Sequence, residues 1–349
     1  MTDVGDLPRA AIALLNWNGW RDTIACLDSL DRIQYPEASV VLCDNSSTDD
    51  SVDRIARWGG ERAWPCRVVE HVADGDERST LTGGGPRLLI VRSQANRGFA
   101  GGMNVAIRYA LASERGYKYV WALNTDTTVE PDSLSNAARA LEANPNAGSA
   151  QSLLVWARQP ALLDSAGMRL LRRGGAMDIR HHRPRAELEP LVVGREAIEV
   201  FGSCAAAALY RADALRTVGL FDESLFQTHE DVDLACRLRE HGYTAVLVPT
   251  SIVYHLGGIS RDRKKRGWML WLAHRNKLRI VARWYPRALG VPILVLGLIR
   301  ASLVALRSPE VSWRVWAALP RTVWSEWRKG ATARARRRIL RLGAAKTIV

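Results

Sequence analysis

Apolar runs of strand length alternate with helix-like stretches along residues 1–125 of this chain. The apolar runs are AIALLNW (11–17), SVVLCDN (39–45), CRVVEHV (66–72), PRLLIVRS (86–93) and YKYVWALN (117–124). Helix-like stretches such as FAGGMNVAIRYALASERG lie between several of them. A chain that alternates strands with helices, without long hairpins, forms a mostly parallel sheet with helices on its faces. We therefore predict an α/β fold around a mostly parallel central sheet.

Charge divides the chain near residue 260. Residues 261–349 contain 22 Lys and Arg against 3 Asp and Glu, whereas residues 1–260 contain 27 against 33. The last segment also holds 7 of the 13 tryptophans. We predict a body over residues 1–260, made of two halves (about 10–125 and about 126–260), followed by a basic, tryptophan-rich helical extension over 261–349.

Polar side chains follow four of the predicted strands at the point where each strand ends. These residues are Asn16 and Asn18, Asp44 and Asn45, Asn96 and Arg97, and Asn124 and Asp126. Ligands of open α/β sheets bind beyond the carboxyl ends of the strands, where amides and carboxylates can recognise a base and a ribose. Turn chemistry alone explains one such loop, but four in order favour a nucleotide site. The sequence has neither the glycine fingerprint of hydride-transfer dinucleotide folds nor a P-loop.

A second group of polar residues is the acidic segment FQTHEDVDLACRLREHGY, with Glu230, Asp231 and Asp233 within four positions. Acids in the first turn of a helix are stabilised by its dipole, and Thr228 is a candidate cap. Asp233 lies four residues before Arg237, a spacing that pairs them on one helix face. These structural roles account for Asp233 and leave Glu230 and Asp231 unexplained.

Seven segments in order resemble one known family. They are LLNWNGW, VVLCDNSSTDDS, NRGFAGGMNVAI, WALNTDTTVEPDSL, GSCAAAALYRADALRTVGLFDESLF, HEDVDLACRLREHGY and VYHLGG. This set is similar to the family 2 glycosyltransferases with the GT-A fold, and most similar to their bacterial rhamnosyltransferase-like branch. The resemblance covers about residues 10–280. It implies an inverting transferase that uses a nucleotide-diphosphate sugar and a divalent cation, with the nucleotide-sugar in the first half and the acceptor in the second.

The resemblance also implies roles for individual residues. The positions that match nucleotide-sugar contacts are Asn16, Trp17, Asn18, Asp44, Asn45, Asn96, Arg97, Gly98, Asn124 and Thr125. Among them, Asp44 matches the acid that recognises the nucleobase, and Asn124 stands at the first acid of the family's D-x-D site. Asp126 matches the metal-binding acid, and His255 matches a histidine that completes the metal site or touches the diphosphate. For His255, the alternative is a strand-end histidine bonded to backbone.

The chemistry of transfer supports a division of roles between two acids. Departure of a diphosphate requires neutralisation of its charge, which Mg²⁺ or Mn²⁺ held by carboxylate oxygens can supply. Inversion by single displacement also requires a free base that removes the acceptor's hydroxyl proton. Asp126 fits the first role, and Asp231, which matches the family's catalytic base, fits the second. Glu230 is assigned as a helper that binds acceptor hydroxyls or orients the loop. The pair His181 and His182 lies among arginines without nearby acids and is interpreted as a solvated loop.

The predicted donor is deoxythymidine-diphosphate rhamnose (dTDP-rhamnose), and the alternative is a uridine-diphosphate hexose. The predicted acceptor is a hydroxyl of a saccharide or of a polyprenyl-linked glycan, in cell-wall or polysaccharide biosynthesis. A sugar-phosphate nucleotidyltransferase is disfavoured because no basic residue follows the first strand before Arg21. A nucleic-acid binder would use the basic tail ATARARRRILRL, but the chain has no recognition motif, so no nucleic-acid partner is expected.

The extension contains the apolar stretch 288–306, which is long enough to span a membrane but includes Arg300 and Pro292. We predict instead that it lies in the interface of an anionic membrane. The tryptophans expected at headgroup depth are Trp284, Trp313, Trp316, Trp324 and Trp327. A contact within the chain or between two copies in a homodimer is the alternative. Because the first residues do not resemble a secretory signal and the five cysteines form no C-x-x-C pair, we expect a cytoplasmic enzyme at the inner face of the membrane.

Overall fold

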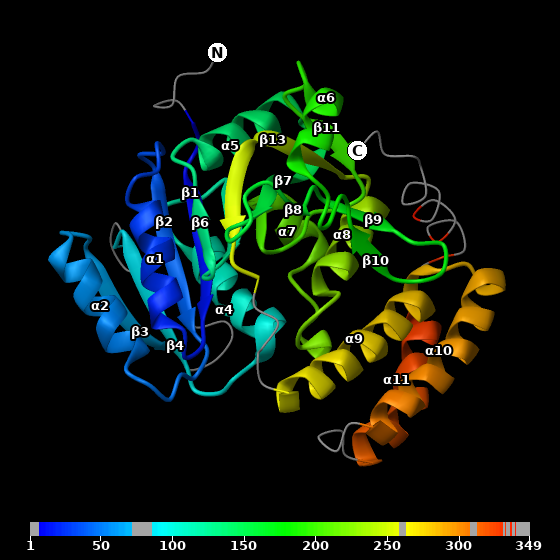
Figure 1. Cartoon of the computed structure of the whole chain (residues 1–349). Helices are drawn as coiled ribbons and strands as arrows, with labels where there is room; N and C mark the ends of the chain where they lie inside the picture. Colours follow the sequence, from blue (N-terminus) through cyan, green and yellow to red (C-terminus); the bar gives the residue numbers. More distant parts are fainter. Residues whose placement is uncertain are drawn as a thin grey trace.

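The computed structural model describes residues 7–71, 86–257, 263–307 and 313–330, together with residues 332, 336 and 339. Its centre is a large twisted sheet with the strand order β11-β13-β7-β12-β5-β1-β2-β4-β3, to which β6 and β8 are joined at β13 and β7 (Figure 1). A separate two-stranded sheet pairs β9 with β10.

The first half of the body is a parallel sheet with its helices. Its strands are β1 (Ala10–Asn16), β2 (Ala38–Asp44), β3 (Cys66–His71), β4 (Leu88–Ser93) and β5 (Tyr119–Asn124). Its helices are α1 (Trp20–Leu30), α2 (Ser51–Glu61) and α4 (Gly98–Ala112). The register pairs Asn16 with Asp44 and Leu15 with Asn124, so the carboxyl ends of three strands are level. The polar residues that follow these strands therefore meet at one edge of the sheet.

The second half of the body extends this sheet. Its strands are β6 (Thr127–Val129), β7 (Ala147–Trp156), β8 (Leu163–Ser165), β9 (Met168–Leu170), β10 (Ala176–Asp178), β11 (Ile198–Val200), β12 (Ala207–Arg211) and β13 (Thr244–His255). Its helices are α5 (Ser133–Ala143), η2 (Arg185–Glu187), α6 (Glu189–Val192), α7 (Ala212–Val218), η3 (Glu223–Leu225) and α8 (Glu230–Glu240). β12 runs antiparallel to both of its neighbours, and β13 runs parallel to β7. The predicted α/β fold with a mostly parallel central sheet is confirmed.

Two apolar layers lie on opposite faces of the sheet, since neighbouring side chains of one strand point to opposite faces. On one face, Leu27 and Trp58 from α1 and α2 pack with α5 against the alternate strand residues that include Ile12 and Trp121. On the other face, α4, α7 and α8 pack against residues that include Ala13 and Val120. Helix α8, which carries the acidic segment, is thereby fixed to the second face.

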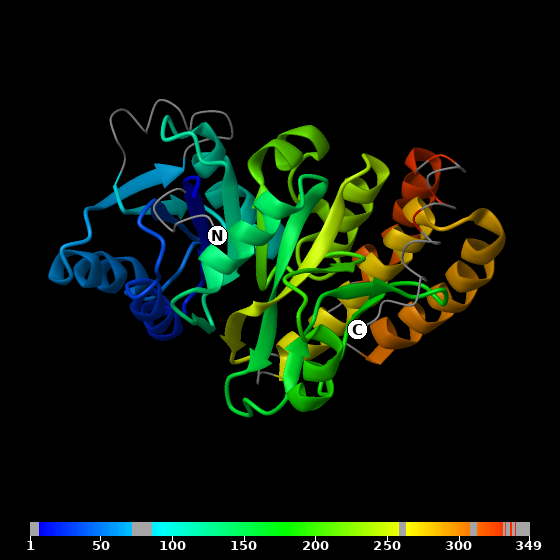
Figure 2. The ribbon, with the colours of Figure 1, turned by 90° about the horizontal axis from the view of Figure 1, so that it is seen from above.

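Within residues 263–307 and 313–330, the extension forms the helices α9 (Arg263–Trp284), α10 (Arg287–Arg307) and α11 (Trp313–Lys329). They lie together at the end of the molecule opposite α2, and the two views agree on this (Figures 1 and 2). Their core is shared with the body, because Val232 and Cys236 of α8 are buried in one cluster with Leu278 and Val281 of α9. The predicted boundary at residue 260 falls among residues 258–262, which lie outside the described part of the chain.

Candidate active site

The loops after β1 and β2 are held together by buried hydrogen bonds. The Asn16 amide donates to Asp44 Oδ1 over 2.8 Å, and Asn16 Oδ1 accepts from the Thr23 hydroxyl. Ser47 donates to both oxygens of Asp44, through its hydroxyl (2.6 Å) and its backbone N–H (3.0 Å). Asn16 is completely buried, so its amide is used within the protein. Asp44 Oδ2 keeps acceptor capacity for a ligand.

Beside Asn16, Trp17 is 45% exposed. Asn18 has φ 53° and accepts the backbone N–H of Thr48 at 2.8 Å. An asparagine tolerates this left-handed conformation because its short side chain can bond locally. The 16–18 segment is thereby fixed beside Asp44, with the indole of Trp17 accessible from solvent.

The turn after β4 is tied to β2 through Asn45. Asn45 donates to Asn96 Oδ1 and to the Gly98 carbonyl, both at 3.1 Å, and accepts the backbone N–H of Arg97 at 2.9 Å. Gly98 has φ +68°, and a Cβ there would lie 2.4 Å from the Phe226 carbonyl oxygen. Only glycine is compatible with this conformation and this approach. The glycine therefore brings the turn into direct contact with the loop that precedes the acidic helix α8.

A second polar group forms where β5 and β13 end. His255, the last residue of β13, has Nε2 3.2 Å from Asp126 Oδ1 and 3.4 Å from the Asn124 amide. Its Nδ1 lies 2.6 Å from Asp164 Oδ2. Although burial opposes the charge, these hydrogen bonds with Asp126 and Asp164 raise the pKa of His255 to about 10. His255 thus bonds carboxylates, not backbone, and Thr125 between Asn124 and Asp126 is anchored on the Leu15 carbonyl at 3.1 Å.

His181 and His182 lie exposed in a turn, as expected, but the expectation that no acid lies near them was wrong. His181 Nδ1 lies 2.7 Å from the Asp164 carbonyl oxygen and 3.2 Å from Asp164 Oδ1, and the His182 ring stacks on Trp156 with centroids 5.0 Å apart. The acid that this pair lacks in sequence is supplied by β8 in the folded chain. The sequence analysis did not identify Asp164 as a site residue, because the segment LLDSAG has no pattern that distinguishes it from an ordinary strand end.

The donor set around His255 fits a divalent cation that is bound together with a phosphate ligand. Within the described ranges, no group of three His, Cys, Asp or Glu residues could enclose a metal. Asp126 and His255 face one another, and they would supply one oxygen donor and, once a bound cation displaces the Nε2 proton of His255, one nitrogen donor. Mg²⁺ and related ions in nucleotide sites are often held by one or two protein ligands, with substrate phosphates and water completing the shell. Asp164 would orient the imidazole, as carboxylates commonly do for metal-binding histidines.

The acidic helix follows a loop in an unusual backbone conformation. Phe226, Thr228 and His229 have φ values of 66°, 69° and 66°, and helix α8 begins at Glu230 with no side-chain cap. The prediction that Thr228 caps this helix was wrong, because His229 occupies the capping position in a left-handed conformation. Such residues persist only where the surroundings hold them, and they cluster at functional sites.

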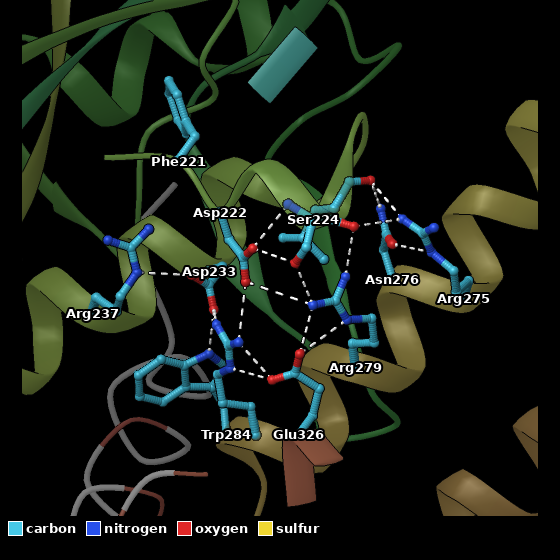
Figure 3. Close-up of polar contacts among 12 residues, drawn as sticks. Phe221, Asp222, Ser224, Asp233, Arg237, Arg275, Asn276, Arg279, Trp284 and Glu326 are labelled. Carbon is cyan, nitrogen blue, oxygen red and sulfur yellow. Dashed lines mark hydrogen bonds and ion pairs between the residues drawn. The ribbon is translucent and has the colours of Figure 1, made fainter. Parts of the chain in front are cut away.

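That loop is held from outside by the extension. Figure 3 shows Asn276 on α9. Its amide nitrogen is within hydrogen-bond distance of the carbonyl oxygens of Leu225 (2.9 Å), Gln227 (2.9 Å) and Thr228 (2.8 Å), and Asn276 is fully buried. Arg275 donates to the Leu225 carbonyl as well, at 2.8 Å. No sequence pattern indicates this support, since Asn276 lies within a basic helix that is far from the acidic segment along the chain.

Glu230 and Asp231 are the first two residues of α8, and their environments differ. Glu230 is 6% exposed, and its Oε2 has no hydrogen-bond partner. Burial and the charge of Asp231 raise the pKa of Glu230 to about 8. Burial and the charge of Asp178 raise the pKa of Asp231 to about 6, while Asp231 accepts backbone N–H bonds from Val232 (2.8 Å) and Ala205 (3.4 Å). Glu230, whose pKa is raised further, is therefore the member of the pair that holds a proton more readily, and Asp231 is the one that ionises first.

Asp233 has a structural position, as the sequence indicated. It is fully buried and accepts hydrogen bonds from Arg237 Nε (2.8 Å), Arg283 Nη1 (2.8 Å) and Trp284 Nε1 (2.9 Å). Figure 3 shows Arg237 and Trp284 beside Asp233. The predicted pairing of Asp233 with Arg237 is confirmed. Arg283 and Arg279 also bind Glu326 of α11, so one polar network joins α8 to the extension.

Comparison with known proteins identifies the family. The family model Glycosyl transferase family 2 matches residues 12–219, and Glycosyl transferase family group 2 matches residues 119–325. The chain belongs to glycosyl transferase family 2 and is a glycosyltransferase. It is 27% identical to N-acetylglucosaminyl-diphospho-decaprenol L-rhamnosyltransferase of Mycobacterium tuberculosis (strain CDC 1551 / Oshkosh). The alignment extends over 247 residues and covers 66% of this chain and 70% of that protein.

Two solved structures share the fold. One is GalNAc-T7 with UDP, GalNAc and Mn²⁺ (TM-score 0.58, 13% identity), and the match covers 81% of this chain and 49% of that chain. The other is the mannosyltransferase PcManGT from Pyrobaculum calidifontis in complex with GDP-Man and Mn²⁺ (TM-score 0.54, 17% identity). This match covers 100% of this chain and 89% of that chain. This chain therefore spans about half the length of GalNAc-T7. Both neighbours are GT-A type transferases, so the predicted GT-A fold is confirmed.

Proposed function

We propose that this glycosyltransferase moves rhamnose from dTDP-rhamnose, with inversion, to a hydroxyl of a polyprenyl-diphosphate-linked sugar. The observation that carries the inverting chemistry is the difference between the two acids at the start of α8. Asp231 ionises before Glu230, and it accepts hydrogen bonds from backbone N–H groups whereas Asp126 is bonded to His255, so Asp231 is free to accept a proton. The name of the mycobacterial relative supports the choice of sugar and acceptor.

The donor nucleotide would lie along the level carboxyl ends of β1, β2, β4 and β5. Asp44 is proposed to recognise the base through its remaining acceptor capacity, with Trp17 and Asn18 beside it. Asn16 and Asn45 would hold the loops, because their amides are bonded within the protein. The 96–98 turn would contact the nucleotide, and Asn124 and Thr125 the ribose. A uridine-diphosphate hexose remains the alternative donor, since these groups do not distinguish the two pyrimidines.

A divalent cation, when bound, would neutralise the leaving diphosphate. Asp126 and His255 are the proposed ligands, and both neighbouring structures contain Mn²⁺. Although burial opposes ionisation, the hydrogen bond from His255 lowers the pKa of Asp126 below its usual value, so Asp126 is ionised and ready to bind a cation. Asp164 would fix the imidazole through Nδ1 and so leave Nε2 directed at the ion.

Asp231 would remove the proton from the acceptor hydroxyl as its oxygen attacks the anomeric carbon. The bond from that carbon to the diphosphate oxygen breaks on the opposite face, which inverts the configuration. The proton ends on Asp231, and the electron pair leaves with the diphosphate. Glu230 holds a proton more readily than Asp231 and is proposed to orient the acceptor by hydrogen bonding.

The extension is proposed to bring this site to an anionic membrane on the cytoplasmic side. The residues 287–306 are apolar enough to span a bilayer, with mean hydropathy 2.2, and only 17% of their most apolar window is buried. Val295, Leu296 and Ile299 are each more than half exposed. Trp284 does not belong to this surface, because it is buried and bonded to Asp233. The side chain of Trp313 lies outside the described residues, and Trp327 is partly buried, so Trp316 and Trp324 remain.

The proposed function is tested with purified protein, Mn²⁺ or Mg²⁺, and a polyprenyl-diphosphate-linked N-acetylglucosamine acceptor. We expect transfer from dTDP-rhamnose, and proton NMR of the product should show an anomeric configuration opposite to that of the donor. Transfer from a uridine-diphosphate hexose alone would establish the alternative donor. Retention of configuration would contradict the role of Asp231 with either donor.

A further inference from the structure

Helix α9 has two faces that differ in how their basic side chains are paired. On the face toward the loop before α8 and toward α11, Arg279 and Arg283 are bonded to acids and Arg275 to a carbonyl (Figure 3). On the adjacent face, His274 and Lys277 lie one turn apart and point along the same side of the helix. In the part of the chain that the structure describes, neither forms an ion pair or hydrogen bond.

Two further cations gather at this second face. α10 packs beside α9 with Gly297 against Leu278, which places Arg300, one turn further on, near His274. Arg173 belongs to the turn between β9 and β10, and the Tyr285 hydroxyl fixes that turn on α9 by bonding the carbonyls of Leu171 (2.6 Å) and Gly175 (3.0 Å). We call these four basic residues, His274, Lys277, Arg300 and Arg173, the cation cluster. Burial and then the charges of Lys277 and Arg300 lower the pKa of His274, so Lys277 and the two arginines carry the charge of the cluster.

The turn approaches Lys277 closely. A Cβ placed on Gly174 would lie 3.3 Å from Lys277 Cε and 2.9 Å from Ile293 Cγ2, and Gly174 has φ +89°. Glycine is required here by conformation and by space. The Lys277 stem is therefore enclosed between this turn and α10, which holds its ammonium group in place.

The cation cluster lies beside the proposed catalytic loop. His229 immediately precedes Glu230 and Asp231, and its Nδ1 is buried without a hydrogen-bond partner. Asn276, which lies between His274 and Lys277 on α9, is 2.8 Å from the carbonyl of Thr228, the residue before His229. Burial and then the charges of Lys277 and His274 lower the pKa of His229 to about 4. Burial and then the charges of Arg300 and Arg173 also lower the pKa of Lys277. Each group thus faces cations where an anion would stabilise it.

An apolar surface adjoins the cation cluster. α10, which carries Arg300, exposes Val295, Leu296 and Ile299 within the preceding turns. A ligand with a charged diphosphate and a hydrocarbon chain would match both parts, with its sugar directed at the start of α8. A nucleotide donor does not fit here, because its proposed site lies at the strand ends of the first half.

We propose that the cation cluster binds the diphosphate of the lipid-linked acceptor. This site rests on the proposed function for the sugar that it presents to Asp231, but its anion chemistry stands on the cations alone. Lys277 and Arg300 would pair with the phosphate oxygens, and His274 and His229 would contribute N–H donors. The apolar face of α10 would continue along the lipid chain.

The site is tested first by binding, independently of sugar transfer. Farnesyl diphosphate is titrated into the full chain by calorimetry, with farnesol as the uncharged comparison. We expect Lys277→Ala to weaken farnesyl diphosphate binding about tenfold or more, and Lys277→Arg to restore most of it. Arg321→Ala removes one exposed charge from α11 and is the matched control, with no expected change. Equal affinity of the wild type and Lys277→Ala for farnesyl diphosphate would overturn the proposal.

Two further experiments distinguish a lipid headgroup from a diphosphate ligand, and a failure of the cation cluster from a failure of the proposed function. If Lys277→Ala loses binding to phosphatidylglycerol vesicles but keeps farnesyl diphosphate, the cluster binds a lipid headgroup and the proposal is wrong. In turnover, the rise in KM for Lys277→Ala should be at least about tenfold larger with a diphosphate-linked acceptor than with a neutral alkyl glycoside of the same sugar. An equal rise with both acceptors would also overturn it. If the wild type uses neither acceptor, the proposed function fails, and the farnesyl diphosphate titration still decides the site.

Discussion

The indole Nε1 of Trp284 donates a hydrogen bond to Asp233 Oδ1 over 2.9 Å, and both side chains are buried. Asp233 lies on α8, three residues after Glu230, whereas Trp284 ends α9 in the extension. The same carboxylate also binds Arg283 of α9. The extension is therefore part of the structure that holds the acidic helix, and it shares an apolar core with that helix.

Asp233→Ala should reduce the free energy of unfolding by about 3–5 kcal/mol, because it leaves the guanidinium groups of Arg237 and Arg283 and the Trp284 indole without their acceptor. Urea unfolding measures the loss. The control is Asp213→Ala on α7, which breaks an exposed pair with Arg216 and should cost less than about 1 kcal/mol. Equal losses for the two variants would show that the network in Figure 3 does not stabilise the fold.

The pH dependence of kcat/KM should report Asp231. A general base must be ionised, so the rate should fall as the pH drops through about 6, the pKa to which burial and Asp178 raise this carboxyl. Removing a neighbouring negative charge lowers the pKa of a carboxyl. Asp178→Asn should consequently move the acidic limb to lower pH, whereas Asp213→Asn, at an exposed position on α7, should leave it in place. An unchanged limb in Asp178→Asn would assign it to another group.

Much of the fold follows from the sequence because its signals are local. The strands around Leu14, Leu42 and Trp121 are short apolar runs, and each is buried on both faces of the sheet. Asp233 and Arg237 were predicted to pair because helical spacing alone brings them together. α10 was harder to predict, since a proline such as Pro292 usually breaks or kinks a helix, whereas α10 continues through it. α10 packs against α9, and this tertiary contact is not described by any local rule.

Only those residues of the candidate site that follow the ends of parallel strands could be predicted from the sequence. The Asn16, Asp44, Asn45 and Asn124 loops meet because the strands are parallel and level. Asp164 and Asn276 were missed, because each acts through a tertiary contact with a residue that is distant in sequence, His255 in one case and Thr228 in the other. Trp284 was misplaced for the same reason, since its burial depends on Asp233.

Asp126→Ala should abolish cation-dependent binding of dTDP-rhamnose, because the proposed metal site loses its carboxylate. His255→Ala should weaken this binding less, and Asp164→Asn should weaken it less again, since Asp164 only orients the imidazole. Calorimetric titration of the donor with Mn²⁺ and with excess chelator measures all three. Undiminished turnover of the wild type in excess chelator would contradict the metal assignment.

The membrane proposal is tested by liposome flotation of the full chain. Binding should require anionic lipid and fade with salt, because arginines on the extension and the apolar face of α10 act together. Leu296→Glu places a charge on that face and should reduce binding strongly. Val193→Glu, at a 78% exposed apolar position beside α6, is the matched control. Release only by detergent, regardless of salt, would indicate a membrane-spanning segment, and no binding to any liposome would favour a dimer contact.

The central claim, that Asp231 is the base of an inverting sugar transfer, is tested most directly by the turnover number of Asp231→Asn. Asparagine is nearly isosteric but cannot accept the proton, so kcat should fall by roughly 100- to 10,000-fold. Donor affinity, measured on the same preparation, should stay within about twofold of the wild type, because Asp231 lies outside the proposed nucleotide and metal sites. A variant that keeps more than about a tenth of wild-type kcat would contradict the assignment of Asp231.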